Sequence, residues 1–169
     1  EHVSYTFAVD GVSRALTHQL VRHRLASFNQ QSQRYVKFTK GVETVKPHTV
    51  EDDEEASRVF DEAIEAVIEG YQKLLEMGIP AEDARYLLPN AAETKIVITM
   101  NIRELLHFFS LRCCNRAQWE IRELAHKMLE LVKPTAPYIF MDAGAPCVRG
   151  NCPEGKMTCG NPYPKVVRD

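Results

Sequence analysis

Residues Lys95 to Cys114 read KIVITMNIRELLHFFSLRCC, and their hydrophobic period changes at Asn101. Lys95 to Met100 is apolar and mostly β-branched, which favours a strand. From Asn101 to about Cys113 the apolar residues recur at three- and four-residue steps, which predicts a helix. Its apolar side carries Ile102, Leu105, Leu106 and Phe109. The segment therefore predicts a strand that leads directly into a helix.

Two further strands are predicted on the N-terminal side of this segment. His2 to Val9 alternates along its length, and Tyr35 to Thr39 has a similar strand-like composition. Asp10-Gly11 indicates a turn after the first of these strands. Ser27 to Gln33 is polar apart from Phe28, and we interpret it as a loop.

The remaining periodic segments predict helices. Ser13 is positioned to cap a helix whose apolar face is Ala15, Leu16, Leu20 and Val21. The clearest helix ends at Gly78, and its apolar residues are Val59, Phe60, Ala63, Ile64, Val67, Ile68, Tyr71, Leu74 and Leu75. Pro80 begins a short helix that holds Arg85, and a last helix covers Ala117 to Val132. We expect the polar stretch from Lys40 to Asp53 to be an exposed connection.

Strands and helices that do not alternate regularly favour an α+β fold over a parallel doubly wound sheet. We expect a central antiparallel sheet flanked by helices, in a single domain over residues 1–169. Residues 134–169 are rich in Cys, Pro and Gly, so we expect an irregular tail there. Because the chain opens on Glu1, already in a strand-like pattern, we also expect that an N-terminal segment is missing.

Bulk composition argues against some kinds of partner and location. A net charge of −2 gives no overall attraction to nucleic acid or to anionic membranes. No apolar run approaches the roughly 20 residues that cross a bilayer. The five cysteines are odd in number, and Cys113 and Cys114 are adjacent. A fully paired disulfide framework is not expected, which favours a cytoplasmic location.

The segment from Arg22 to Tyr35 carries the chemistry. It begins with Arg22-His23-Arg24, continues with hydroxyl and amide side chains, and reaches another arginine at Arg34. Guanidinium groups bind phosphate bidentately, and hydroxyls and loop amides supply further donors. This composition suits a nucleotide phosphate beside a polar ring. A solvated basic helix end that complements the helix dipole is the alternative that residue types alone leave open.

Spacing adds to this composition. Seven residues separate Arg22-His23-Arg24 from Ser32, and four other blocks accompany the motif in order. These blocks are Glu1-His2 through Phe7, Ala84-Arg85 with Leu88-Pro89, Asn101-Ile102-Arg103, and Leu111-Arg112 with Ala117 to Ile121. Together with Asn29 and Arg34, they resemble the signature of flavin-dependent thymidylate synthases over most of residues 1 to about 132.

The resemblance implies an enzyme that methylates dUMP with carbon from methylenetetrahydrofolate and with hydride that passes from NADPH through FAD. It implies that FAD binds to Arg22, His23, Arg24, Leu25, Gln30, Asn101, Ile102, Arg103 and His107. It implies that dUMP binds to Gln19, Leu20, Val21, Arg22, Gln30, Gln31, Ser32, Gln33, Arg34, Arg85 and Arg112. The sequence differs from many members at His107, where asparagine is frequent, and from some at Gln30, where glutamate occurs. A homotetramer with shared active sites is also implied, without nucleic acid or membrane partners.

The resemblance makes Arg112 the catalytic residue, placed against the uracil ring. A fixed guanidinium stabilises negative charge that develops on the N3/O2/O4 system without having to titrate. Without the resemblance, an arginine that complements a helix C-terminus is the alternative interpretation of Arg112. Surface salt bridges are the corresponding alternative for Arg85 and Arg103, and a partly buried structural histidine is the alternative for His107.

No protein nucleophile is expected. No base is spaced to activate Ser32, which we assign to nucleotide binding, and Cys113 and Cys114 fall in an apolar helical pattern. Cys147, Cys152 and Cys159 offer only three thiols, without pairs two residues apart, so we predict no metal ligand. Two other functions remain as alternatives: a nucleotide- or RNA-binding domain without flavin, and a zinc-dependent interaction module built on the tail.

Overall fold

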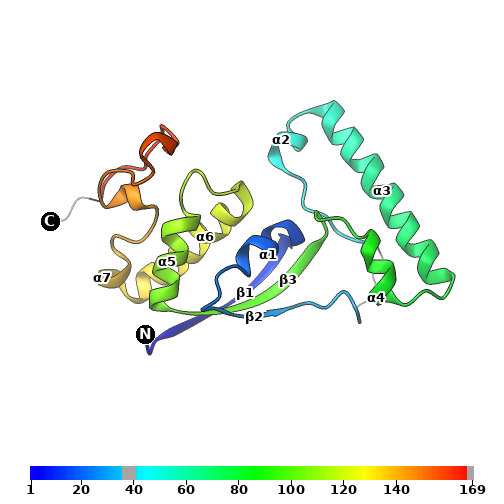
Figure 1. Ribbon diagram of the computed structural model, residues 1–169, viewed down its shortest axis with the longest axis horizontal. Helices are drawn as coiled ribbons and strands as arrows, with labels where there is room; N and C mark the ends of the chain where they lie inside the picture. The colour runs from blue at the N-terminus through cyan, green and yellow to red at the C-terminus, as the bar shows by residue number, and fades with distance from the viewer. Residues whose placement is uncertain (36–40, 167–169) are drawn as a thin grey trace. The chain divides into compact units, whose positions relative to one another are not determined.

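The computed structural model describes residues 1–35 and 41–166 (Figure 1). These residues form a mixed α+β fold with a three-stranded sheet, as the sequence predicts. The strands are β1 (Ser4–Ser13), β2 (Ser27–Gln30) and β3 (Glu93–Asn101). The helices are α1 (Arg14–Leu20), α2 (His48–Glu51), α3 (Glu54–Glu76), α4 (Ala81–Ala84), α5 (Ile102–Arg112), α6 (Trp119–Val132) and α7 (Pro137–Phe140). Short 3-10 turns are η1 (Arg85–Leu87), η2 (Lys133–Thr135), η3 (Pro146–Val148) and η4 (Gly155–Met157).

The strand order is β1-β3-β2, so β3 is central. Thr6 and Thr99 share a hydrogen bond of 2.9 Å, and Lys95 Nζ donates to Asp10 Oδ2 at 2.7 Å. Residue numbers thus rise along β1 as they fall along β3, which makes this pair antiparallel. Alternate residues of β3 are buried, as expected for a strand that presents one face to the core: Thr94, Ile96, Ile98 and Met100.

Two strand predictions need correction. The predicted turn at Asp10-Gly11 is wrong, because β1 continues to Ser13 through Gly11, whose φ of 72° is readily accessible to glycine. The predicted loop at Ser27 to Gln33 begins with β2, which pairs along an edge of β3 and tolerates polar residues because its backbone supplies the pairing. In the predicted strand from Tyr35 to Thr39, Tyr35 lies in a turn and the other residues lie outside the described part.

Ser13 caps α1 as predicted, with its hydroxyl accepting from the backbone N–H of Leu16 at 3.0 Å. The helix ends at Leu20, so Arg22, His23 and Arg24 follow it in turns. Val21, predicted on the apolar face, is 45% exposed because it lies beyond the last helical turn. The helix that we predicted up to Gly78 is confirmed as α3, and Gly78 has a φ of 83°.

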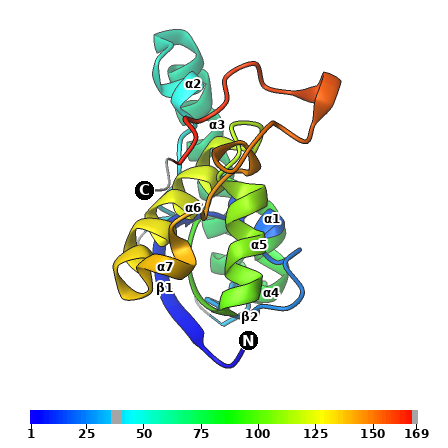
Figure 2. The ribbon, with the colours of Figure 1, turned by 90° about the vertical axis from the view of Figure 1, so that its left-hand side faces the viewer.

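The described chain divides into two compact units. The first comprises residues 1–7, 19–28 and 98–169. Within it α5 packs against α6, as Figure 2 shows. Its buried side chains include Leu105, Phe108, Phe109, Ile121, Leu124 and Met128. As far as Val166, the tail that follows α6 contains α7 and three 3-10 turns, η2, η3 and η4.

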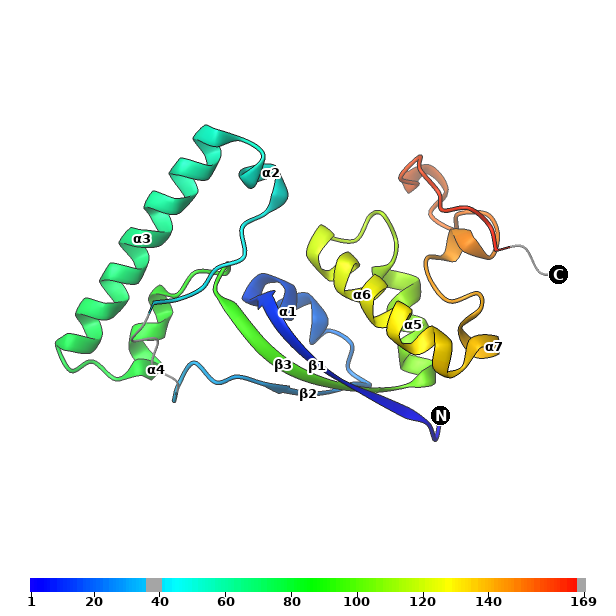
Figure 3. The ribbon, with the colours of Figure 1, turned by 180° about the vertical axis from the view of Figure 1, so that it is seen from behind.

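The second unit comprises residues 8–18 and 29–97. In this unit α3 contacts α4 and η1 (Figure 3). The predicted connection at Lys40 to Asp53 contains the short helix α2, and Val42 is buried there. In the described residues no helix is both long enough and apolar enough to cross a bilayer.

Candidate active site

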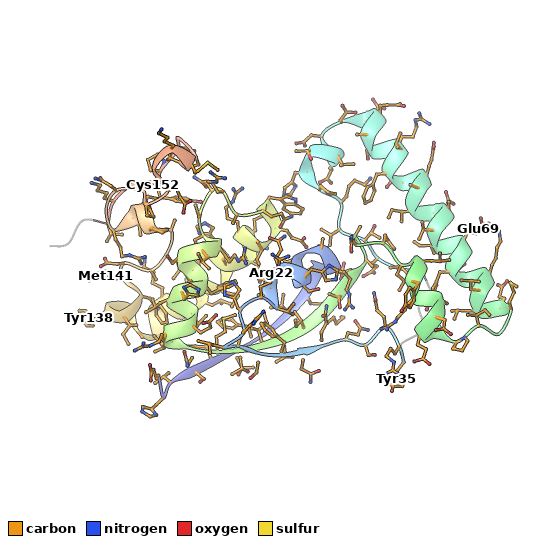
Figure 4. The ribbon with its side chains drawn as sticks, in the orientation of Figure 1. Arg22, Tyr35, Glu69, Tyr138, Met141 and Cys152 are labelled. Atoms are coloured by element: carbon orange, nitrogen blue, oxygen red, sulfur yellow. The ribbon has the colours of Figure 1, made fainter. Side chains whose placement is uncertain are left out.

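In the first unit, two segments present the residues that the sequence analysis selected. One runs from the last turn of α1 into the stretch that follows it, where Figure 4 labels Arg22. The other is α5, which begins immediately after β3 with Asn101 as its N-cap. The selected residues in this unit are Gln19, Leu20, Val21, Arg22, His23, Arg24, Leu25, Asn101, Ile102, Arg103, His107 and Arg112.

A chain of hydrogen bonds joins the two segments through His23. Nδ1 of His23 lies 3.1 Å from Oε1 of Glu104, and Nε of Arg112 donates to Nε2 of His23 at 3.1 Å. A terminal nitrogen of Arg112 also reaches the backbone carbonyl of Gln19 at 3.4 Å. His23 and Glu104 are only 5% and 4% exposed. The guanidinium of Arg112 is therefore held from one side by uncharged acceptors.

Burial sets the protonation state of His23 within this series of hydrogen bonds. Burial lowers the pKa of His23 below its ordinary 6.5, the hydrogen bond to Glu104 opposes that effect, and the positive charge of Arg112 adds to it. His23 is consequently neutral near pH 7. Because an arginine N–H can only donate, Nε2 of His23 is the acceptor and its proton is on Nδ1. Burial also lowers the pKa of Arg112, and the nearby charge of Arg22 acts in the same direction.

Most other selected side chains of this unit face solvent. Arg22, Arg24 and His107 are exposed, and Leu25 is 75% exposed despite being apolar. Arg103 forms an exposed ion pair with Glu1 at 2.7 Å. Leu20 is fully buried in the core, so its side chain is not available to a ligand. The side chain of Asn101 accepts from the backbone N–H of Glu104 at 2.9 Å, which is a helix-capping role.

The second unit holds the remaining selected residues: Gln30, Gln31, Ser32, Gln33, Arg34 and Arg85. The Gln30 amide donates to the hydroxyls of Thr17 and Thr94 at 3.1 and 3.4 Å. The Ser32 hydroxyl accepts from the backbone N–H of Arg34 at 3.1 Å, which shapes the turn. These contacts fix the loop after β2.

Glu82 connects the two arginines of this group. Its carboxylate accepts from Nε and a terminal nitrogen of Arg34 at 3.0 and 2.7 Å, and its backbone carbonyl accepts from Nε of Arg85 at 3.0 Å. Burial lowers the pKa of Arg14, and the charge of Arg85 lowers it further. The second unit thus gathers guanidinium groups of the kind that bind a phosphate.

Burial makes one of the cysteines, Cys113, a poor nucleophile. All five lie in the described residues and are free thiols, and burial raises the pKa of Cys113 to about 12. A cavity of about 240 Å³ in the first unit is lined by Cys114, Cys147, Cys152 and Cys159, among other residues. In the part of the chain that the structure describes, no group of His, Cys, Asp or Glu is placed to hold a metal ion.

The tail is tied to the loop between α5 and α6. Tyr163 donates to Asn115 Oδ1 at 2.7 Å, and the Asn115 amide donates to the backbone carbonyl of Asn161 at 2.7 Å. Arg116 also donates to the backbone carbonyl of Met157. The tail therefore covers the segment that directly follows Arg112.

Sequence reasoning missed Glu104, Glu82, Arg14 and Thr17. One signal for Glu104 was available, because it lies four residues before Phe108 and so shares a helix face with a core residue. A buried carboxylate is costly without a hydrogen-bonded or charged partner. A glutamate on an apolar helix face therefore indicates that such a partner exists, but not which residue it is. Arg85, whose charge acts on Arg14, and Gln30, which donates to Thr17, lie outside the helix that carries both residues, so local pattern gave no indication of these interactions.

Comparison with known proteins places the chain in a family. The family profile described as Thymidylate synthase complementing protein matches residues 1–138. A flavin-dependent thymidylate synthase of Geobacter sulfurreducens is 60% identical over 161 residues, which cover 95% of this chain and 69% of that protein. The corresponding protein of Clostridium tetani is 51% identical over 176 residues, with 95% and 70% covered, and that of Pyrococcus abyssi is 47% identical over 165 residues, with 93% and 68% covered. The chain therefore belongs to the flavin-dependent thymidylate synthases, a family of enzymes.

Proposed function

We propose that this chain catalyses the reductive methylation of dUMP to dTMP. Methylenetetrahydrofolate is the carbon donor, NADPH is the source of hydride, FAD is the cofactor, and no protein nucleophile bonds to the pyrimidine. The observation that carries the proposal is the half-buried Arg112 guanidinium, held by neutral acceptors on His23 and Gln19. Membership in the family supports the same reaction.

Arg112 acts on the uracil ring in this proposal. Hydride addition at C6 places negative charge on the N3/O2/O4 system, and a preorganised guanidinium stabilises that charge. Because Arg112 binds His23 and Gln19 rather than a carboxylate, its positive charge is not neutralised within its own contacts. That arrangement leaves the charge available to the substrate.

The phosphate of dUMP binds to the arginines of the second unit. Arg34 and Arg85 are both ordered by Glu82, and bidentate guanidinium contacts suit a phosphate dianion. The proposed dUMP-binding residues are Gln19, Leu20, Val21, Arg22, Gln30, Gln31, Ser32, Gln33, Arg34, Arg85 and Arg112. Because the side chain of Leu20 is buried, the proposed contact of Leu20 with dUMP is made by its backbone.

The exposed residues of the first unit fit the chemistry of FAD. Arg22 and Arg24 offer guanidinium groups for a pyrophosphate, and Leu25 offers an exposed apolar surface for a ring. The proposed FAD-binding residues are Arg22, His23, Arg24, Leu25, Gln30, Asn101, Ile102, Arg103 and His107. When bound, FAD supplies the hydride chemistry that no amino acid side chain provides.

Two local environments support the proposal that no protein nucleophile is used. A thiol with a pKa of about 12 is almost entirely protonated at neutral pH, which makes Cys113 unreactive. Ser32 has its hydroxyl in a turn contact with the backbone of Arg34 rather than in contact with a base. The chain's own residues therefore bind, orient and stabilise charge.

A homotetramer with shared active sites is part of the proposal. The helix α3 is strongly amphipathic. Among its 23 residues, all of which the structure describes, Tyr71 alone is buried. Phe60, Ile64, Val67 and Ile68 remain partly exposed along its apolar side. Such an uncovered stripe suits contact with another subunit. Free thiols support the cytoplasm as the proposed location.

A dUMP-dependent assay tests the proposed function. We expect a yellow protein that releases FAD on denaturation, oxidises NADPH when dUMP and methylenetetrahydrofolate are present, and forms dTMP. Arg112→Ala should lower turnover by about a hundredfold or more, as loss of a charge-stabilising donor typically does. Arg149→Ala removes an exposed arginine of the same unit and should leave turnover unchanged. A colourless protein that neither binds added FAD nor oxidises NADPH with dUMP would refute the proposal.

A further inference from the structure

The buried carboxylate of Glu104 is hydrogen-bonded to the imidazole of His23, the same ring that holds Arg112. Glu104 is in the first turn of α5 and Arg112 is its last residue, so the two ends of one helix meet the same histidine. A buried carboxylate is costly unless it is hydrogen-bonded or paired. Its position beside Nδ1 of His23 therefore affects which ring nitrogen carries the proton.

The consequence concerns the tautomer of His23. A neutral imidazole has one N–H and one acceptor nitrogen, and its two forms differ little in free energy in water. A carboxylate beside Nδ1 favours the form with the proton on Nδ1, because that form donates to the carboxylate. The lone pair of Nε2 then points to Arg112, whose Nε–H can only donate.

The tautomer with its proton on Nε2 would disrupt this series of hydrogen bonds. With its proton on Nε2, the ring would place two N–H groups against each other at the 3.1 Å contact with Arg112. The Nδ1 lone pair would meanwhile face the carboxylate of Glu104. Both contacts would become repulsive, and the guanidinium would lose its fixed orientation.

We propose that Glu104 is a positioning residue for the synthase reaction, which orients Arg112 toward the pyrimidine by fixing the tautomer of His23. The inference rests on the proposed function for its kinetic readout, because Arg112 is assigned to the uracil ring there. Its structural content, the tautomer, is measurable on the protein without substrates. At metal sites, a carboxylate that accepts from the far nitrogen of a ligating histidine orients that ring in the same physical way.

Kinetics of Glu104→Gln give the first test. The amide keeps the volume but offers both a donor and an acceptor to Nδ1, so the tautomer is no longer fixed. We expect kcat to fall about tenfold and the KM for dUMP to change less than about threefold, because the guanidinium acts on charge that develops in the transition state. Glu130→Gln is the control, since Glu130 is an exposed glutamate of α6 in the same unit. It should stay within about twofold of the unmodified protein.

A double-mutant cycle separates positioning from general structural damage. If Glu104 acts through Arg112, adding Glu104→Gln to Arg112→Ala should change kcat by less than about twofold. If Glu104 only supports the fold, the second substitution should lower activity by the same factor in both backgrounds. Unchanged kinetics of the single variant, or such multiplicative losses, would overturn the inference while leaving the proposed function intact.

The ring nitrogens of His23 give the second test, which does not depend on activity. Nitrogen-15 chemical shifts of the imidazole should show a neutral ring with its proton on Nδ1, and the signal is assigned by its loss in His23→Asn. Glu104→Gln should populate the other tautomer. An Nε2-protonated ring in the unmodified protein would overturn the inference even if dUMP turnover is observed. Absence of turnover with an Nδ1-protonated ring would instead count against the proposed function.

The pH profile adds a check that involves the neighbours of His23. The charged and titratable groups around its ring are Glu104, Arg112 and His107. Protonation of Nε2 at low pH removes the acceptor for Arg112, so kcat should fall on the acid side. The carboxylate favours the protonated ring, so its loss in Glu104→Gln should move this acid limb to lower pH. An acid limb that does not move would contradict the inference.

Discussion

Nε and a terminal nitrogen of Arg34 donate to the same carboxylate oxygen of Glu82, at 3.0 and 2.7 Å, and both side chains are about half exposed. An ion pair in that setting contributes little to stability, because water screens the charges. Arg34 nevertheless points in a fixed direction. We therefore expect the loss of Arg34 to affect ligand binding more than the free energy of unfolding.

Arg34→Ala is the corresponding prediction. We expect the free energy of unfolding to change by less than about 1 kcal/mol, and the KM for dUMP to rise about tenfold because a charge-assisted hydrogen bond to phosphate is lost. Urea denaturation and steady-state kinetics measure the two quantities. Arg58→Ala, which also breaks exposed ion pairs with Glu55 and Glu62, is the control and should alter neither KM nor kcat. An unchanged KM in Arg34→Ala would remove Arg34 from the phosphate site.

The buried imidazole of His23 predicts a pH dependence of stability. Burial lowers its pKa in the folded state below the ordinary 6.5, so the unfolded chain binds the proton more readily. The free energy of unfolding should therefore fall as the pH decreases through 6.5, and the loss should level off below the folded-state pKa.

Denaturation curves between pH 5 and 8 would measure this effect. His23→Asn should show a shallower dependence than the unmodified protein. His18→Asn removes an exposed histidine and should keep the original dependence. If both variants retain the same slope, His23 does not contribute to it.

Cys113→Ala tests the absence of a thiol nucleophile. Because its pKa is raised to about 12, this buried cysteine should not react with a thiol reagent in the folded protein, whereas the exposed Cys159 should. dUMP turnover of Cys113→Ala should remain within about threefold of the unmodified protein, since the proposed reaction has no covalent step at the sulfur. A loss of several orders of magnitude in a variant with normal thermal stability would show the opposite.

Gly11→Ala tests the backbone within β1. Space does not limit the substitution, because an added Cβ would meet only Glu93 Oε1 at 4.0 Å. A φ of 72° is unfavourable for alanine, so the free energy of unfolding should fall by about 1 kcal/mol. Gly11→Asn should lose less, because asparagine tolerates this region better. Equal stability of all three proteins would mean that the strand relaxes at this position.

The sequence predicts those elements whose pattern is local. The apolar period of α3 and the change of period at Asn101 are sufficient for α3, β3 and α5. The strand β2 has no such local pattern, because Ser27 and Asn29 are polar. It forms by pairing with β3, about 65 residues away in the chain. Gly11 similarly resembles a turn residue until the pairing partner of β1 is known.

The candidate site divides in the same way. Arg22, His23, Arg34 and Arg112 are selected by residue type and motif spacing, but their mutual contacts are not. Glu104 lies 81 residues from His23, and no periodicity encodes that pairing. Burial is the missing information, because a carboxylate that is solvated needs no partner and a buried one does.

The direct junction between β3 and α5 has a further consequence for the length of the chain. Asn101 is both the last residue of the strand and the N-cap of the helix, so no linker can absorb an added residue. One residue inserted after Asn101 would advance the helical phase of every following side chain by about 100°. Glu104 and Arg112 would rotate together away from His23, although every residue type were preserved. At this junction the spacing of residues is constrained as strictly as their identity.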